Sequence, residues 1–372
     1  MKTDEQRSLA VKSRHPREGP SVGAIVVNFN GGDRILRVVE TLFLQTYPLT
    51  QIIVVDNNSS DGSVDRVTER YSSVHAIRLA DNIGLSAARN VGLRALHTTL
   101  AFIVDHDIYA EDAAIETMVA AYLEHDAAVI CPRIRLLPER DTVQIQGAAI
   151  HFLSMLILRN SYRPVSDVPD QASAVDAFTG GCLLVHRETI LEAGAFDELV
   201  FFYFEDLELS LRLRLRGYRF WCEPRAEVFH QPAAGTPGLS YRRGGSYPRR
   251  RAYLTMRNRL FVLFVHYRIR TIIVLLPALL CFEVSALTMA CLRGWPSEWF
   301  RAWSWQFTNF SKILLRRKSA QRHRSCRDRE VLVGGRLPLA SGSVDSAAQR
   351  ILVVLLSFLM NGYWSLARRL IG

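Results

Sequence analysis

The chain has 372 residues, 49% of them hydrophobic and 22% charged, so it can bury a substantial core and is not a disordered protein. This length suits one large domain with an extension. Residues 1–230 carry 23 Lys and Arg against 31 Asp and Glu, whereas residues 231–372 carry 23 against 5. The basic second part favours an anionic partner, either nucleic acid or a membrane surface with phosphate-bearing lipids.

The six cysteines are scattered and form no Cys-x-x-Cys pair. They fit structural roles in a reducing compartment better than a zinc site or a disulfide framework. Residues 1–20 are polar and charged and contain no apolar run. We therefore expect a flexible arm rather than a signal peptide, and catalysis in the cytosol.

Between residues 21 and 104 apolar runs alternate with stretches whose apolar residues recur at helical spacing. Polar, turn-forming residues separate the two kinds of segment. Apolar strands that alternate with amphipathic helices favour an α/β fold, with a mostly parallel sheet covered by helices on both faces. The pattern predicts strands over residues 21–30, 51–56, 74–79 and 100–104, and helices over residues 33–44, 63–71 and 85–95.

Three polar clusters follow the apolar runs: Asn28-Phe29-Asn30, Asp56-Asn57-Asn58 and Asp105-His106-Asp107. In parallel sheets ligands bind outside the carboxyl ends of the strands, so these clusters predict one shared site. An Asp-x-Asp pair at a strand tip suits a divalent cation that also holds a diphosphate. In an extended strand Asp105 and Asp107 would point to one side and His106 to the other. No glycine-rich dinucleotide or P-loop motif follows the first strand, which disfavours a dehydrogenase or an NTPase.

A second acidic pair, Glu205-Asp206, follows the aromatic run Phe201-Phe202-Tyr203-Phe204 at the start of a helix-like segment. A carboxylate there can act as a general base. The alternative is that two acids simply favour a helix N-terminus. Upstream, Thr179-Gly180-Gly181 permits a close backbone approach because glycine has no side chain. Together the two acidic sites indicate an enzyme that displaces a nucleoside diphosphate from a sugar.

Beyond residue 230 the composition changes. Residues 235–248 are rich in Gly, Pro and Ser and predict a loop. Residues 271–292 are long enough to span a bilayer, but they contain Pro277 and Glu283, and an unpaired charge at the centre of a bilayer is costly.

Four tryptophans between residues 295 and 305 follow, in the manner of interfacial aromatics. A basic stretch over residues 312–329 comes next. The last apolar segment, residues 351–364, is short for a span and suits an interfacial helix. We expect a helical, membrane-associating extension; the alternative is a buried helical subdomain with solvated basic faces.

These motifs make the chain resemble the family 2 glycosyltransferases of the GT-A fold over about residues 20–260. The resemblance implies an arm over residues 1–20, a GT-A domain over residues 21–260 and an apolar, basic extension over residues 261–372. Among relatives, the pattern is most similar to bacterial rhamnosyltransferases that act on lipid-linked cell-wall or O-antigen glycans. The matching segments are residues 26–31, 54–63 and 82–90, Asp105-His106-Asp107, residues 179–182 and 196–198, Glu205-Asp206 and His230.

The resemblance assigns the donor nucleotide, of UDP or dTDP type, to the first two strand ends. Asp56 is expected to accept the N3–H of a uracil or thymine ring; the alternative is a turn-forming aspartate. Asn28 and Asn30 are expected to line the same pocket, partly through backbone groups. Arg89 is expected near the base or phosphate, unless it is a surface arginine.

The other roles that the resemblance implies concern the sugar, the metal and the acceptor. Asp105 is expected toward the ribose. Asp107 is expected on Mg²⁺ or Mn²⁺, with His230 as a further metal or diphosphate contact or as a structural residue. Gly180 and Gly181 are expected to line a sugar, Asp206 to be the base with Glu205 in support, and Arg257 and Asn258 to contact the acceptor or its phosphate or to lie on a solvated helix face.

The expected activity is therefore the inverting, metal-dependent transfer of a sugar to a hydroxyl of a lipid-linked glycan, in a single displacement. The expected location is the cytoplasmic face of the inner or plasma membrane, either peripheral or with one inserted segment. One alternative is a non-catalytic, membrane-bound protein that binds nucleotide sugars or acts as a scaffold. Another is a sugar nucleotidyltransferase, although its glycine-rich signature is absent. No recognisable nucleic-acid motif accompanies the basic residues, so we expect no nucleic-acid partner.

Overall fold

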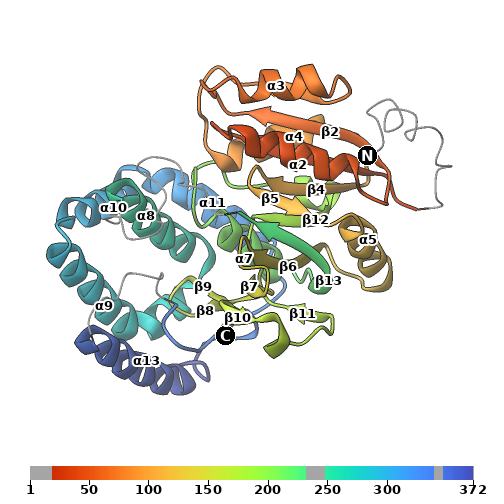
Figure 1. Ribbon diagram of the computed structural model, residues 1–372. Coiled ribbons are helices and arrows are strands. Elements are labelled where there is room, and N and C mark those ends of the chain that lie inside the picture. Colours follow the sequence, from red (N-terminus) through yellow and green to blue (C-terminus); the bar gives the residue numbers. More distant parts are fainter. Residues whose placement is uncertain (1–18, 232–247, 339–346, 372) are drawn as a thin grey trace.

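The computed structural model describes residues 19–231, 248–338 and 347–371. The arm expected over residues 1–20 and the loop expected over residues 235–248 lie outside the described residues, apart from Gly19, Pro20 and Pro248. Figure 1 shows a sheet flanked by helices, with a group of further helices gathered on one side of the molecule, away from β3 and α3.

The centre of the sheet is parallel and confirms the elements predicted for residues 21–104. Its strand order is β3-β2-β1-β4. Right-handed crossovers through helices are the usual connection between parallel strands. The elements in chain order are β1 (Val22–Asn28), α2 (Asp33–Phe43), β2 (Leu49–Asp56), α3 (Ser63–Arg70), β3 (His75–Arg78), α4 (Leu85–Ala95) and β4 (Leu100–Asp105).

Beyond β4 the sheet is mixed. β12 (Cys182–His186) runs antiparallel to β4, and β6 (Val129–Leu136), β7 (Thr142–Ile145) and β10 (Arg163–Pro164) continue the order. β13 (Phe220–His230) lies parallel to β6 and antiparallel to both β5 (Ile108–Ala110) and β11 (Ser173–Val175). The predicted parallel sheet is thus confirmed for β1 to β4, and antiparallel strands extend it. Three further helices belong to this part: α5 (Ala114–Glu124), α6 (Arg187–Glu192) and α7 (Glu205–Leu215).

Both faces of the sheet are covered, as the apolar strands predicted. Alternate residues of β1 point to opposite faces. Ala24 and Val26 join a core with side chains of α2, α3 and α5, whereas Ile25 and Val27 join one with side chains of α4, α6 and α7. Because its strands are buried on both sides, the sheet needs apolar runs rather than an alternating pattern.

The C-terminal helices pack against the rest of the chain. Helix α8 runs through residue 260, where the sequence analysis places a domain boundary. A strand of this part, β14, pairs with β8 in a small second sheet. The elements are β8 (Ala148–His151), β9 (Met155–Leu158), α8 (Arg249–His266), α9 (Ile269–Leu292), α10 (Pro296–Thr308), α11 (Phe310–Arg322), α12 (Asp328–Val331), β14 (Leu332–Val333) and α13 (Ala347–Ala367).

Helix α7 lies between the two parts of the molecule. Leu209 and Leu213 of this helix belong to the core under the sheet. Leu207, Leu211 and Leu215 belong to a third core that includes side chains of α8, α9, α11 and α13. The helix that begins with the second acidic pair is therefore fixed from both sides by buried apolar contacts.

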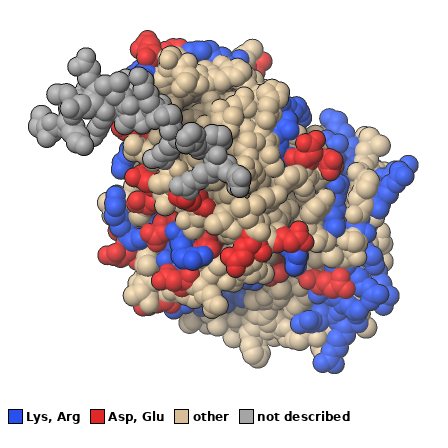
Figure 2. All heavy atoms as spheres, turned by 90° about the vertical axis from the view of Figure 1, so that its right-hand side faces the viewer, with Lys and Arg blue, Asp and Glu red and all other residues tan. Residues whose placement is uncertain are grey.

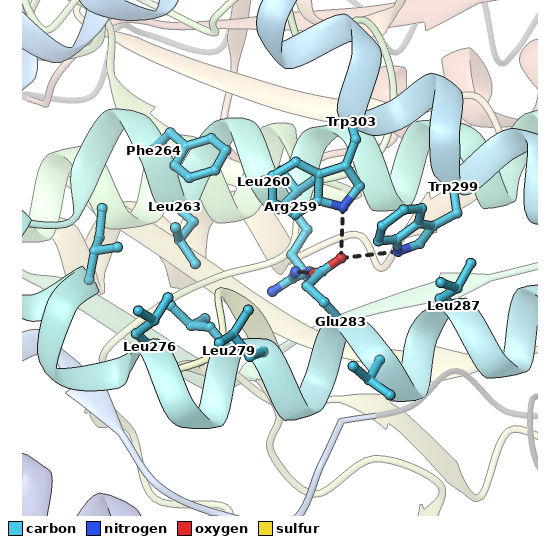
Figure 3. Close-up of a pocket in the computed structure, with 13 residues that line it drawn as sticks. Arg259, Leu260, Leu263, Phe264, Leu276, Leu279, Glu283, Leu287, Trp299 and Trp303 are labelled. Carbon is cyan, nitrogen blue, oxygen red and sulfur yellow. Dashed lines mark hydrogen bonds and ion pairs between the residues drawn. The ribbon is translucent and has the colours of Figure 1, made fainter.

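Helix α9 is the one helix in the described part of the chain that is long and apolar enough to cross a bilayer. The charged residue within this helix, Glu283, has partners in the fold. Glu283 forms an ion pair with Arg259 of α8 and accepts hydrogen bonds from Trp299 Nε1 at 3.1 Å and Trp303 Nε1 at 3.0 Å. Figure 3 shows these groups converging in an otherwise apolar pocket between α8, α9 and α10. The partly buried carboxylate of Glu283 therefore links α9 to α8 and α10.

Charged residues are unevenly spread over the surface. On the face shown in Figure 2, acidic and basic residues mix over one part, while Lys and Arg crowd the right-hand margin. Exposed apolar residues accompany the charges on the C-terminal helices, for example Ile273 on α9 and Phe358 on α13.

Candidate active site

The register of the parallel strands brings the predicted polar clusters together. Asn28 lies opposite Asp56 across β1 and β2, and Val27 lies opposite Asp105 across β1 and β4. The carboxyl ends of these three strands therefore meet at one edge of the sheet. The convergence predicted from the sequence is confirmed.

The side chain of Asn28 is bound inside the protein at this edge. Its exposed fraction is 0%, so a pocket here would be lined by its backbone and not by its side chain. Its Nδ2 group donates to Asp56 Oδ1 at 3.2 Å and to Ser63 Oγ at 2.9 Å. Asn28 is thus a positioning residue, which fixes the carboxylate of Asp56 at the strand end.

Asn30 lies at the exposed side of the same edge. Its backbone N–H donates to Ser59 Oγ at 2.9 Å, and its Oδ1 accepts the backbone N–H of Ser60 at 2.9 Å. The residue has a φ of 51°, in the left-handed region that asparagine tolerates better than most residues. Asn30 joins the loop after β1 to the loop after β2.

Arg89 is not a surface residue, and its guanidinium is bound by groups within the protein. It is 1% exposed, and its guanidinium lies below the sheet edge. Nη2 donates to Asp105 Oδ1 at 2.8 Å and to the carbonyl of Gly180 at 2.7 Å, and Nη1 lies 3.3 Å from Glu205 Oε1. One arginine of α4 thereby connects both acidic sites, which the sequence places 100 residues apart.

The glycine pair lies against this arginine. A Cβ atom added to Gly180 would lie 2.6 Å from Arg89 Nη1, which is closer than a side chain can approach. A Cβ atom at Gly181 would lie 2.8 Å from Ile108 Cδ1. The carbonyl of Gly181 accepts the N–H of Asp105 at 2.9 Å. The two glycines are therefore required by packing at the site, and this does not depend on a bound sugar.

The chain turns immediately after Asp105, so the extended geometry assumed for Asp105 and Asp107 is wrong. His106 and Asp107 form a turn between β4 and β5. Asp105 faces Arg89, whereas Asp107 Oδ2 lies 3.3 Å from His230 Nε2 at the end of β13. The two aspartates thus have different partners.

The Asp107–His230 pair fits a cation site. Nδ1 of His230 lies 2.7 Å from Gln144 Oε1, and this contact orients the imidazole ring. Nε2 of the same ring faces the carboxylate of Asp107. An imidazole nitrogen and a carboxylate oxygen are both ligands that divalent cations accept in proteins. No group of three His, Cys, Asp or Glu side chains that could hold a metal occurs within the described ranges, so the substrate would have to complete the coordination.

A strained loop leads into the second acidic pair. Phe201, Tyr203 and Phe204 have φ values of 65°, 64° and 69°, in the left-handed region that non-glycine residues rarely adopt. Asn258 of α8 donates from Nδ2 to three carbonyls of this segment, those of residues 200, 202 and 203, at 2.7–3.0 Å. The strained backbone therefore persists because another helix binds its carbonyl groups.

This arrangement excludes the alternative expected for Arg257 and Asn258. Neither lies on a solvated helix face, because both side chains are buried. Nη2 of Arg257 donates to the carbonyls of Leu199 and Val200 at 3.0 and 2.7 Å. The amide of Asn258 is likewise occupied by backbone carbonyls. Both residues position the loop that carries the acidic pair.

Glu205 and Asp206 begin α7 with different surroundings. Glu205 is buried beside Arg89, whereas Asp206 is half-buried. Asp206 Oδ2 accepts the N–H of Gly180 at 3.3 Å, and Oδ1 accepts the N–H of Leu207 at 2.7 Å. Of the two carboxylates, Asp206 has the greater access to a molecule outside the protein.

Burial raises the pKa of both acids. It raises the pKa of Glu205 to about 7, assisted by the negative charge of Asp206 and opposed by Arg89. It also raises the pKa of Asp206, against the two backbone N–H groups that bind its carboxylate. A carboxylate whose pKa lies nearer neutrality accepts a proton more readily, so both shifts suit acid–base chemistry.

The sequence analysis missed a buried network behind the site. Glu208 of α7 accepts hydrogen bonds from Arg212 Nε at 2.9 Å and Nη2 at 2.8 Å, and its Oε1 lies 2.9 Å from His266 Nε2 of α8. All three side chains are buried. The sequence does show Glu208 and Arg212 four residues apart on a helix rich in leucine. That spacing could not reveal the network, because it occurs on solvated helix faces as well.

The architecture and the acidic edge define the class of protein. The sheet, its covering helices and the carboxylates at the carboxyl ends of β2 and β4 have the arrangement of the GT-A fold. Residues 24–172 match the family model described as Glycosyl transferase family 2. The chain is a glycosyltransferase that carries a family 2 catalytic domain, as the motifs predicted.

Curated relatives include an N-acetylglucosaminyl-diphospho-decaprenol L-rhamnosyltransferase from Mycobacterium tuberculosis. It is 26% identical over 235 residues, which cover 57% of this chain and 76% of the relative. The O-antigen biosynthesis protein RfbC from Myxococcus xanthus is 25% identical over 238 residues, which cover 61% of this chain but 18% of that protein.

Among solved structures, the crystal structure of GalNAc-T7 with UDP, GalNAc and Mn²⁺ is similar to this one, with a TM-score of 0.54 and 16% identity. The match covers 68% of this chain and about half (49%) of that chain. At this identity the likeness supports the fold alone.

Proposed function

We propose that the protein transfers a sugar, with rhamnose as the leading candidate, from a nucleoside diphosphate of UDP or dTDP type to a hydroxyl of a lipid-linked glycan. The observation that carries the proposal is the Arg89 guanidinium, which holds Asp105 and Glu205 together so that a donor edge and a candidate base share one site. The rhamnosyltransferase from Mycobacterium tuberculosis, matched over three quarters of its length, supports the choice of sugar and acceptor.

In this proposal Asp206 removes the proton from the acceptor hydroxyl. The acceptor oxygen forms a bond to the anomeric carbon while the bond from that carbon to the diphosphate breaks, and the nucleoside diphosphate leaves. A single displacement inverts the configuration at the anomeric carbon. Asp206 is only half-buried, and the N–H of Gly180 orients its carboxylate.

Glu205 supports the base by its position between Asp206 and Arg89. Because its pKa is raised to about 7, it shares protons with the neighbouring carboxylate near neutral pH. Asp56, held by Asn28, is proposed to accept the N3–H of the uracil or thymine ring. Asp107 and His230 are proposed to hold Mg²⁺ or Mn²⁺, which when bound would neutralise charge on the leaving diphosphate.

The C-terminal helices are proposed to bind the cytoplasmic surface of an anionic membrane. Exposed apolar side chains on α9 and α13 supply the contact, and the excess of Lys and Arg beyond residue 230 supplies attraction to anionic lipids. Contact between α9 and α13 includes a hydrogen bond from the Tyr363 hydroxyl to the Val274 carbonyl, which keeps the two helices side by side. This arrangement favours a peripheral protein with α9 lying at the membrane surface.

The proposed function is tested with purified protein, lipid-linked glycan from membrane extracts and a panel of UDP-, dTDP- and GDP-sugars. Release of nucleoside diphosphate that depends on both donor and acceptor, and that is lost in Asp206→Asn, supports transfer. Donor binding without any release would support the alternative of a non-catalytic nucleotide-sugar-binding protein. Formation of a nucleotide sugar from a sugar phosphate would support a nucleotidyltransferase.

A further inference from the structure

A cavity of about 730 Å³ lies beside the strained loop, outside the acidic edge of the sheet. It is bounded by the loop, the first turns of α8, the helix α10 and the start of α11. Its lining is rich in basic side chains. The charged residues that line it are Arg249, Arg250, Arg257, Arg301, Lys312, Glu198 and Glu298.

The two acids do not balance these cations. Glu298 is shared by Arg249, at 3.2 Å, and Arg301, at 2.6 Å. Glu198 pairs with Arg94, which lies outside the cavity lining, at 3.2 Å. The cavity therefore has an excess of positive charge.

Three of the basic side chains make no ion pair with the residues that the structure describes. Arg250 lies over the ring of Phe201, with its guanidinium carbon 5.4 Å from the ring centre, and Lys312 is exposed at the start of α11. Arg257 is buried, and burial lowers the pKa of its guanidinium. A charge that has lost hydration gains most from an incoming anion, so the cavity suits a strongly anionic group.

The position of the cavity relates it to the acceptor and separates it from the donor. Leu199 and Phe201 line it, and α7 begins with Glu205 only four residues after Phe201. Even fully extended, the five residue-to-residue steps from Phe201 to Asp206 span no more than about 18 Å. One sugar and a diphosphate can bridge such a distance. The donor diphosphate, by contrast, meets the acidic edge formed by Asp105 and Asp107, where a cation is needed.

The helices that bound the cavity also carry exposed aromatic side chains that do not line it. Phe300 and Phe307 of α10 and Phe310 of α11 are all exposed, although phenylalanine is usually buried. A ligand that carries both a diphosphate and a hydrocarbon chain would have to extend beyond the cavity to reach them.

We infer that this cavity binds the diphosphate of the lipid-linked acceptor, with Arg250 and Lys312 as its principal contacts. The inference rests on the proposed function, because it requires a glycan acceptor whose hydroxyl reaches Asp206. Arginine binds phosphate oxygens through two parallel N–H groups, and lysine adds a compact charge. The sugar next to the diphosphate would then lie along the loop that Asn258 holds.

The first test compares acceptors. Arg250→Gln, Lys312→Gln and the double variant are assayed with a sugar linked to a short-chain prenyl diphosphate and with the same sugar as an alkyl glycoside. We expect the double variant to raise KM for the diphosphate acceptor at least tenfold, and by at least five times more than for the alkyl glycoside. Lys318→Gln, which removes an exposed lysine from the same helix but outside the cavity, is the matched control and should behave as the wild type. Equal losses with both acceptors would overturn the inference.

A second test does not depend on turnover, so it separates failure of this inference from failure of the proposed function. Binding of the prenyl diphosphate without sugar is followed in EDTA by tryptophan fluorescence, since Trp305 lines the cavity. Saturable binding that the double variant loses supports the site even if no donor is turned over. The inference is wrong if the wild type does not bind, or if the variants lose only flotation with anionic vesicles while their affinity for the prenyl diphosphate stays unchanged. Inorganic pyrophosphate, titrated in parallel, shows whether the hydrocarbon chain contributes.

Discussion

Arg89 donates from Nη2 to the carboxylate of Asp105 at 2.8 Å, and this bond joins helix α4 to the end of β4 inside the protein. The same guanidinium reaches Glu205 at the start of α7 and the carbonyl of Gly180. Four segments of the site therefore depend on one buried side chain. Loss of either carboxylate would leave the buried guanidinium with one ion pair in place of two, which is costly.

Gly180→Ala should disturb this centre. The added Cβ would lie 2.6 Å from Arg89 Nη1, and the arginine cannot move away because its other bonds hold it. We expect a loss of about 1–3 kcal/mol in the free energy of unfolding, typical of overpacking, together with reduced transfer. Denaturant unfolding measures the first and released nucleoside diphosphate the second.

Gly362→Ala is the matched control for that substitution. Gly362 lies within α13, and a Cβ atom there would meet nothing within 4 Å. Alanine is the better helix former by about 1 kcal/mol, so the control should be neutral or slightly stabilising. If both substitutions cost the same, the close contact at Gly180 is not what limits that position.

Asp206→Asn should transfer sugar about 10²–10⁴-fold more slowly than the wild type while binding the donor normally, because a general base acts mainly in the transition state. Glu205→Gln should retain more activity, since Glu205 is buried and cannot reach the acceptor. Single-turnover rates and donor affinity are the measurements. Reversed effects of the two variants would move the base to Glu205, and wild-type rates in both would make the pair structural.

Asp107→Asn should lower metal-dependent turnover strongly without unfolding the protein, because the residue lies in a turn at the rim of the sheet. Wild-type activity should fall in excess EDTA and return with Mg²⁺ or Mn²⁺. A fluorescence titration of Mn²⁺ into the wild type and the variant provides a readout separate from turnover. Undiminished activity of the wild type in EDTA would refute the metal role.

Glu208 should make the stability of the fold sensitive to acid. Burial raises the pKa of Glu208, but Arg212 and His266 outweigh it and lower the pKa to about 2, from 4.5 in an unfolded chain. The charged carboxylate thus stabilises the fold fully above about pH 4.5, and this contribution is lost as the pH falls toward 2. The free energy of unfolding of the wild type should therefore drop over this range.

Glu208→Gln tests this account through urea unfolding at pH 7, 5, 4 and 3. Breaking a buried pair costs about 3–5 kcal/mol, so the variant should be less stable at pH 7 and should lose less on acidification. Glu69→Gln, at an exposed position of α3, is the control and should follow the wild-type curve. Parallel pH curves for the wild type and Glu208→Gln would contradict the assignment.

Membrane binding should depend on the exposed apolar face of α13. Phe358 and Leu359 are 77% and 66% exposed, so replacing both with serine should leave the core intact and reduce flotation with anionic vesicles at least fivefold. Leu123→Ser removes a residue with a similar exposure of 64% from α5, far from the C-terminal helices in sequence, and should float as the wild type does. Deleting the helices is a poorer test, because they share a core with α7. Equal flotation of all three proteins would argue that the helices form only a structural subdomain.

The amino-acid sequence by itself determined the alternation of strands and helices from β1 to β4 and the placement of Asp56 and Asp105 at strand ends. It could do so because the periodicity of apolar residues and the turn chemistry are local properties of the chain. The family assignment also followed from the sequence, since its motifs are short and ordered along the chain.

Only the tertiary structure decided what the buried polar residues contact. Arg89 and Asn258 carry no local sign of burial, yet one joins both acidic sites and the other holds the strained loop, because each is surrounded by segments distant in sequence. The pairing of Glu283 and the integration of the C-terminal helices likewise depend on contacts across the fold. A local pattern shows which residues are apolar or charged; the partner that compensates a buried charge is fixed by packing in three dimensions.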